Sequence, residues 1–178
     1  MRIIAGDYKG RRLYTPADHR IRPTSDKVKE ALFSILGEEI DGAVVCDLFS
    51  GTGNLGLEAL SRGADKCYFG DHSGESIKLI KDNIEMCRAE DYSVVIHGDF
   101  KKTLSLIGER VNIFFLDPPY NKDLWEDAML MIKELDLLAE GGIIVCEHRS
   151  RQELDDEVAG FEKVKERNYG KVVLSLYR

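Results

Sequence analysis

The chain has 178 residues, of which 43% are hydrophobic and 32% charged, a balance typical of one globular domain with a sizeable core. Its formal net charge of −7 argues against a protein that coats nucleic acid over its whole surface. The charge is segregated, because residues 1–30 carry eight basic and four acidic side chains. This segment predicts local contact with a polyanion, although a solvated charged arm explains the count equally well.

Several broad classes are disfavoured. No apolar run near the N-terminus has the length of a signal peptide, and no later run approaches a membrane span. The cysteines and histidines are scattered, without the close pairs that a zinc site or a redox motif needs. We therefore expect a cytoplasmic, monomeric protein with free thiols, no metal and no membrane contact.

The chain is expected to begin with a small basic arm, residues 1–22, followed by one main domain, residues 23–178. Gly6 and Gly10 flank three residues near the start, and this pattern predicts a short hairpin. Either Thr24 or Ser25 can cap a helix that runs to residue 36, because apolar residues recur on one face of that segment.

Strand-like apolar runs then alternate with helix-like segments, which predicts an α/β fold with a mostly parallel sheet. The predicted strands are residues 43–48, 66–70, 93–97, 111–116 and 142–147, and the predicted helices are residues 55–61, 75–87, 101–106 and 124–137. The last part differs in kind, because residues 161–167 and 171–177 alternate in polarity around a central glycine. This pattern predicts an antiparallel hairpin, which departs from the plain dinucleotide-binding fold.

A glycine-rich loop follows the first predicted strand. Residues 51–56 match the pattern G-x-G-x-x-G, which is a weak signal alone and also fits a nicotinamide cofactor. Asp47 ends the strand, where a carboxylate can receive the cationic amino-acid end of S-adenosyl-L-methionine but would repel a pyrophosphate. We therefore expect Ser50, Gly51 and Gly53 to approach this cofactor.

Two further acidic residues end the next two predicted strands. Asp71 follows Asp47 by 24 residues, a spacing at which a carboxylate binds the ribose hydroxyls of either kind of cofactor. Asp99 can accept a hydrogen bond from an adenine amino group while Phe100 packs near the ring. Asp99 can also cap the following helix, and both roles can hold together.

The sequence Asp117-Pro118-Pro119-Tyr120 follows an apolar strand, at the edge where open α/β sheets bind ligands. A conjugated amino group on a base is a poor nucleophile, and the Asp117 side chain and Pro118 carbonyl can accept both of its hydrogens. Tyr120 offers an aromatic face for an unpaired base. The motif therefore predicts catalysis at an amino group, without distinguishing adenine N6, cytosine N4 and guanine N2. A rigid Pro-Pro turn is the purely structural alternative.

Several segments together resemble the RsmD family of bacterial 16S ribosomal RNA guanine-N2 methyltransferases. They are Met1-Arg2-Ile3-Ile4-Ala5-Gly6, Gly10-Arg11-Arg12-Leu13, Arg22-Pro23-Thr24-Ser25-Asp26-Lys27-Val28-Lys29-Glu30-Ala31-Leu32-Phe33, the Asp47 loop through Gly53, Gly56 to Ala64, and the Asp-Pro-Pro-Tyr motif. The resemblance implies a Rossmann-like class I methyltransferase dependent on S-adenosyl-L-methionine, with a seven-stranded sheet and an N-terminal extension that touches RNA. Its implied substrate is one guanine of 16S rRNA, methylated during assembly of the 30S subunit.

The RNA-binding candidates come partly from charge and partly from this resemblance. The basic arm predicts contacts by Arg2, Lys9, Arg11 and Arg12. The resemblance places Arg22, Thr24 and Ser25 beside the active site, where Arg22 can bind a phosphate or base edge or form a surface salt bridge. Glu147 ends the strand at 142–147, where an ion pair or cap is as plausible as a function, and it is not among our candidates.

Two other enzyme classes compete with this interpretation. A DNA adenine-N6 methyltransferase needs a segment that reads base sequence in the groove, and the chain has little spare length for one. A nicotinamide-dependent oxidoreductase has no use for an Asp-Pro-Pro-Tyr motif in this setting. A non-enzymatic ribosome-assembly factor leaves the cofactor loop unexplained.

Overall fold

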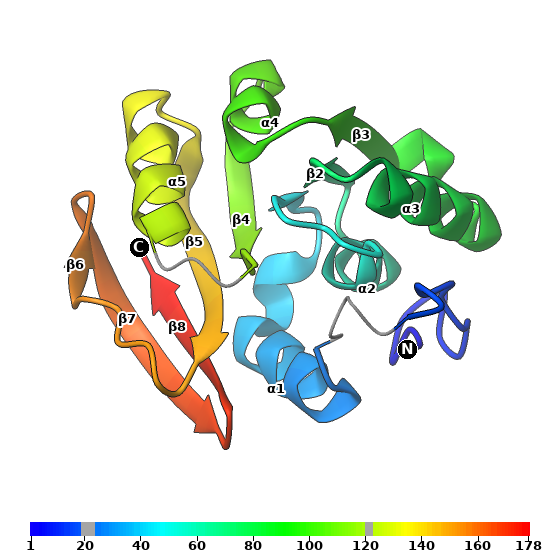
Figure 1. The fold of residues 1–178 in the computed structure, drawn as a ribbon, viewed down its shortest axis with the longest axis horizontal. Coiled ribbons are helices and arrows are strands. Elements are labelled where there is room, and N and C mark those ends of the chain that lie inside the picture. The colour runs from blue at the N-terminus through cyan, green and yellow to red at the C-terminus, as the bar shows by residue number, and fades with distance from the viewer. Residues whose placement is uncertain (19–23, 120–122) are drawn as a thin grey trace.

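The computed structural model describes residues 1–18, 24–119 and 123–178 and contains one sheet with helices on both faces (Figure 1). The helices are α1 (Asp26–Leu36), α2 (Asn54–Ser61), α3 (Gly74–Cys87), α4 (Phe100–Leu106) and α5 (Asp123–Glu134), with short 3₁₀ helices η1 (Gly37–Ile40) and η2 (Glu90–Tyr92). The strands are β1 (Val44–Asp47), β2 (Lys66–Asp71), β3 (Ser93–His97), β4 (Val111–Leu116), β5 (Leu138–Arg149), β6 (Glu157–Val158), β7 (Phe161–Tyr169) and β8 (Val172–Tyr177).

The strands follow the order β3-β2-β1-β4-β5-β8-β7-β6. The first five strands of the sequence are parallel, whereas β8 lies antiparallel between β5 and β7. The α/β fold and its closing antiparallel hairpin are thus confirmed. Strand order reverses between β1 and β4, and open α/β sheets bind ligands at such a switch point, beyond the carboxyl ends of the strands.

The described part of the sheet has one strand more than the seven expected. The additional strand is the two-residue β6, which pairs with β7 through Val158 and Phe161. β5 also begins earlier than the predicted residue 142, because Leu138 pairs with Val111 on the far side of a register shift. A strand of two residues is too short to show a periodic pattern in the sequence, and a register shift interrupts the pattern at the start of β5. Neither feature could therefore be predicted from local periodicity.

The sheet separates two apolar cores. The first core contains the buried faces of α1, α2 and α3, and the second contains those of α4 and α5. Successive strand residues point to opposite faces, so that Val45 joins the first core and Cys46 the second. Because both faces are covered, the central strands are mostly apolar, and polar side chains occur near their ends.

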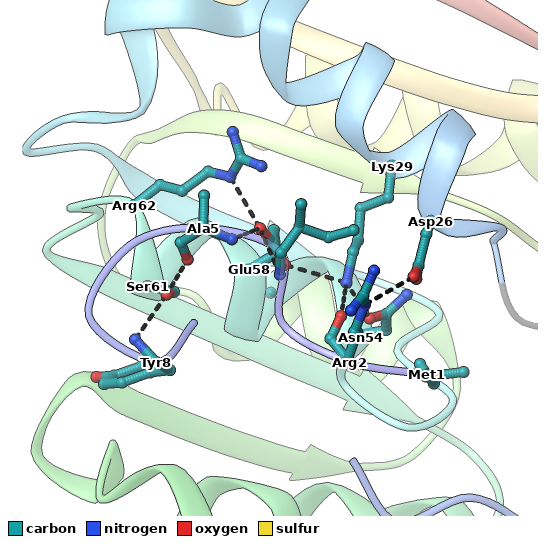
Figure 2. Close-up of polar contacts among 12 residues, drawn as sticks. Met1, Arg2, Ala5, Tyr8, Asp26, Lys29, Asn54, Glu58, Ser61 and Arg62 are labelled. Atoms are coloured by element: carbon teal, nitrogen blue, oxygen red, sulfur yellow. Dashed lines mark hydrogen bonds and ion pairs between the residues drawn. The ribbon is translucent and has the colours of Figure 1, made fainter. Parts of the chain in front are cut away.

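The N-terminal segment folds back on itself beside α2 and α3 (Figure 1). Arg2 and Arg12 form an isolated antiparallel bridge, and the Ile3 amide donates to the Arg11 carbonyl at 3.0 Å. The backbone amides of Ile4 and Ala5 donate to the Glu58 carboxylate of α2, as Figure 2 shows for Ala5. The N-terminal segment therefore packs on the helix that begins at the glycine loop.

A second connection runs through Asn83 of α3. Its Oδ1 accepts from the Tyr14 amide at 2.7 Å, and its Nδ2 donates to the Tyr14 carbonyl at 3.1 Å and the Thr52 carbonyl at 2.9 Å. Asn83 is fully buried, and buried amide groups of this kind are costly unless they are hydrogen-bonded. One side chain thus holds both the arm and the glycine loop.

Candidate active site

A cavity of about 1220 Å³ opens at the carboxyl ends of β1, β2, β4 and β5. It brings together most of the residues that the sequence predicted, namely Asp47, Ser50, Gly51, Asp71, Asp99, Phe100, Asp117, Pro118, Thr24 and Ser25. Gly53 is not among the residues that line the cavity, and it is the N-cap of α2. Arg22 and Tyr120, which were also predicted, lie outside the described residues.

The glycines of the loop meet two different requirements. Gly51 and Gly53 have φ values of 59° and 82°, in the left-handed region that side chains disfavour. Gly56 lies inside α2, where a Cβ atom would stand 2.3 Å from Cε1 of the Phe69 ring on β2. The first two glycines therefore turn the chain, and the third lets the helix approach the sheet closely.

Asp47 is a buried carboxyl group at the end of β1. Its Oδ2 accepts from the Gly56 amide at 3.0 Å. Burial, assisted by the charges of Asp71 and Glu147, outweighs this hydrogen bond and raises the pKa of Asp47 to about 7. A cation in the cavity would favour the ionised carboxylate, so Asp47 is suited to a positively charged ligand group. Ser50 supports the loop by donating from Oγ to the Asp47 carbonyl at 2.5 Å.

Asp71 and Asp99 both line the cavity, and both accept hydrogen bonds from nearby backbone amides. The two oxygens of Asp71 accept from the Gly51 and Ser73 amides, each at 2.9 Å, so this carboxylate fixes the glycine loop. Asp99 is the N-cap of α4, and its Oδ1 accepts from the Lys102 amide at 2.8 Å. The capping role of Asp99 is thus confirmed, and its contact with adenine stays a prediction.

The Asp117-Pro118 turn lines the same cavity as the glycine loop. Asp117 directly follows β4, and burial, followed by the charges of Glu147 and Asp47, raises the pKa of its carboxyl group well above the usual range. Pro118 is buried and Pro119 is exposed. Because proline has no amide hydrogen, the backbone of Pro118 and Pro119 offers only carbonyl oxygens, which accept hydrogen bonds from a ligand.

Glu147 is a residue of the cavity that our sequence analysis left out. Leu116 of β4 lies opposite Cys146 of β5, so that Asp117 and Glu147 follow as neighbours on adjacent strands. The Thr24 hydroxyl donates to Glu147 Oε2 at 2.8 Å. Burial raises the pKa of Glu147, and the Thr24 hydrogen bond opposes this shift in part. The available signal was its position, since the sequence places Glu147 at the end of the predicted strand 142–147, although β5 continues to Arg149.

Thr24 and Ser25 were both predicted as possible caps of α1, and the structure distinguishes them. Ser25 is the N-cap, and its Oγ accepts from the Val28 amide at 3.3 Å. Thr24 is turned toward the cavity instead.

The predicted basic residues of the arm have different surroundings. Arg2 is paired with Asp26 at 3.1 Å on the surface. Arg11 donates to the Met86 carbonyl at 3.2 Å and lies over the Tyr8 ring, 5.2 Å from its centre. Lys9 and Arg12 are exposed. Arg11 is thus partly held by contacts within the protein, whereas Lys9 and Arg12 present their charges to solvent, and the RNA contacts of all these basic residues stay predictions.

The described residues offer neither a metal site nor a membrane-spanning helix. Across residues 1–18, 24–119 and 123–178, no group of three or more His, Cys, Asp or Glu side chains is arranged to hold a metal ion. In the same parts of the chain, no helix has the length and apolar character needed to cross a bilayer. The four cysteines are buried and unpaired, as expected.

The strand order, the closing hairpin and the cavity at the switch point together define the α/β methyltransferase fold. A solved Escherichia coli structure, described provisionally as methyltransferase yhhF, superposes with a TM-score of 0.89 at 30% identity and covers 99% of this chain and 96% of that chain. The model of the family described as "Conserved hypothetical protein 95" matches residues 1–178, and the chain belongs to this family.

Two relatives in sequence agree with that assignment. A Bacillus subtilis protein, provisionally named rRNA methyltransferase YlbH, is 36% identical over 181 residues that cover 100% of this chain and 98% of the relative. Ribosomal RNA small subunit methyltransferase D of Escherichia coli is 34% identical over 179 residues, which cover 100% of this chain and 89% of the relative. The resemblance to the RsmD family is therefore confirmed.

Proposed function

We propose that this protein transfers the methyl group of S-adenosyl-L-methionine to the exocyclic N2 amino group of a guanine in 16S ribosomal RNA. The observation that carries the proposal is that the Asp47 loop and the Asp117-Pro118 turn open into one cavity. Its volume of about 1220 Å³ exceeds the roughly 300–1,000 Å³ of single small-ligand sites. It therefore has room for a nucleoside cofactor and a base together.

The residues of the cofactor half fit S-adenosyl-L-methionine by their chemistry. Asp47 would hold the cationic amino-acid end, Asp71 would bind the ribose hydroxyls, and Asp99 with Phe100 would receive the adenine. When bound, the cofactor supplies an electrophilic methyl group on a positively charged sulfur. Gly51 and Gly53 let the backbone pass close to it, and the amides that Asp71 fixes preserve that loop shape.

The residues of the target half act on the amino group. Asp117 and the Pro118 carbonyl accept its two hydrogens, which favours the geometry in which the nitrogen lone pair faces the methyl group. Asp117, whose pKa is raised well above the usual range, is also suited to accept the proton that the nitrogen loses. We keep the prediction that Tyr120 stacks on the target base.

RNA as the substrate is supported by the names of the relatives. Lys9 and Arg12 are exposed cations that can contact phosphates, and Thr24 and Ser25 lie at the cavity itself. We extend the proposal to Arg2 and Arg22 as further RNA contacts, to an assembling 30S subunit as the substrate particle, and to a monomeric enzyme.

The test uses labelled S-adenosyl-L-methionine with naked 16S RNA, 30S particles or duplex DNA, followed by digestion and identification of the methylated nucleoside. We expect N2-methylguanosine from one of the two RNA substrates. Recovery of N6-methyladenine, or no transfer to any substrate, contradicts the proposal. Asp117→Ala should abolish transfer and leave cofactor affinity nearly unchanged, whereas Asp47→Ala should weaken cofactor binding.

A further inference from the structure

Glu147 and Asp117 occupy equivalent places on two neighbouring parallel strands. Since β4 and β5 pair through Leu116 and Cys146, the next residue of each strand is an acid, and neighbouring strands lie roughly 4.8 Å apart. Both side chains line the same cavity. The two carboxyl groups therefore open side by side toward the space that the target base would occupy.

The side chain of Glu147 has a defined orientation. Thr24 donates to its Oε2 at 2.8 Å, which leaves the second oxygen, Oε1, able to accept a hydrogen bond from a molecule in the cavity. Thr24 is itself buried, and it directly precedes the N-cap of α1. A third acid near Asp47 and Asp117 is electrostatically unfavourable. Clusters of acids of this kind are typical of functional sites, in which a bound ligand donates hydrogen bonds to the carboxyl groups.

The bases differ at the edge that would meet these two acids. Guanine presents the N1–H and an amino hydrogen of N2 as two parallel donors on its Watson–Crick edge. Adenine and cytosine present an amino group beside a ring nitrogen without hydrogen, and the lone pair of that nitrogen would face a carboxylate. Enzymes that act on an unstacked base read this edge through hydrogen bonds.

We propose that Glu147, positioned by Thr24, accepts a hydrogen bond from guanine N1–H and thereby selects guanine over adenine and cytosine. Asp117 receives the neighbouring amino group, so that neighbouring acids from two adjacent strands read two adjacent donors. This inference rests on the proposed function. It supplies the choice of base that the Asp-Pro-Pro-Tyr motif does not make.

The test removes the N1 hydrogen by changing the base, and it changes one group on the protein. After the methylated guanine has been mapped, particles are assembled with 16S RNA that carries guanine or 2-aminopurine at that position. 2-Aminopurine keeps the amino group but has neither the hydrogen on N1 nor the oxygen on C6, so the response of the Glu147 and Thr24 variants identifies the contact with N1. The wild-type protein should prefer guanine by about ten- to a hundredfold in kcat/KM. Glu147→Gln places an amide donor opposite N1 and should move the preference toward 2-aminopurine by at least about tenfold.

Controls separate selection of the base from general damage. Glu140→Gln changes an exposed acid of the same strand and should leave the preference unchanged. Thr24→Val removes the hydrogen bond to Glu147 while keeping every carboxylate and should weaken the preference for guanine, whereas Thr24→Ser should retain it. The Thr24 pair decides the matter if Glu147→Gln does not fold.

An equal loss on both substrates, or an unchanged preference in Glu147→Gln and Thr24→Val, overturns the proposal. A wild-type protein that methylates no guanine would instead contradict the proposed function.

Discussion

The side chains of Lys29 and Glu58 form an ion pair inside the protein, with Nζ 3.0 Å from Oε2 and 0% of either side chain exposed (Figure 2). Lys29 also donates to the Arg2 carbonyl at 2.6 Å and to Asn54 Oδ1 at 2.7 Å. The other oxygen of Glu58 accepts from Arg62 at 2.9 Å. The charges are therefore fully hydrogen-bonded, and they join α1 to α2 and to the N-terminal arm.

Removing one partner of this pair should destabilise the fold strongly. Lys29→Met removes the fully buried cation of Glu58 and leaves this carboxylate with Arg62 alone, and we expect the free energy of unfolding to fall by about 3–5 kcal/mol. Urea denaturation measures the change. Lys78→Met removes an ion pair with Asp82 on the surface of α3 and should leave stability nearly unchanged. Similar effects of the two variants would mean that the buried pair has no special importance.

Cofactor affinity should depend on pH through Asp47. Because its pKa is about 7 in the free protein, the carboxylate that attracts the cationic cofactor forms as the pH rises through that value. The α-amino group of the cofactor loses its proton above roughly 8, so affinity should pass through a maximum between the two values. Calorimetric titration from pH 5.5 to 9 measures this profile. In Asp47→Asn the rise on the acidic side should disappear, and its persistence would exclude Asp47 as the titrating group.

The same buried acid predicts how stability varies with pH. The pKa of Asp47 rises from 3.8 to about 7 on folding, so the folded protein binds more protons than the unfolded chain between these values. The free energy of unfolding should therefore decrease as the pH rises from about 4 to 7. The raised pKa values of Asp117 and Glu147 act in the same direction.

Thermal denaturation at pH 5 and pH 8 tests this sign. Asp47→Asn should lose less stability than the wild type between the two values, because one buried group no longer ionises. A wild-type protein that is more stable at pH 8 than at pH 5 contradicts the expectation.

The close approach of α2 to β2 predicts the effect of a single methyl group. A Cβ at position 56 would stand 2.3 Å from the Phe69 ring, so Gly56→Ala must push the helix away and should cost about 1–3 kcal/mol. Gly108→Ala is the matched control, because a Cβ there meets nothing within 4 Å. Because α2 begins at the glycine loop, Gly56→Ala should also weaken cofactor binding, as measured in the same calorimetric assay.

Local pattern was sufficient for much of the fold. The strands predicted at 93–97 and 111–116 have the same limits as β3 and β4, because each is an apolar run bounded by polar residues. The acids that end these runs could be placed at the cavity for the same reason, since parallel strands end at one edge of the sheet.

What sequence reasoning missed depends on pairing between distant segments. Glu147 became a site residue only when the register of β4 and β5 placed it beside Asp117. Thr24 and Ser25 are equivalent as capping residues in sequence, and the bond from Thr24 to Glu147, 123 residues away, distinguishes them. Neither relationship has a periodic signal along the chain.

The amide group of Asn83 touches Tyr14 of the arm and Thr52 of the glycine loop at once. A ligand that orders one of these segments also restricts the other through Asn83. A second ligand that binds the other segment then has a smaller loss of conformational entropy, and the effect is the same in either order of binding. Cofactor should therefore slow amide hydrogen exchange in residues 1–18, and RNA should slow it around residue 52. Cofactor binding would thus order the N-terminal arm of the enzyme before the enzyme binds RNA.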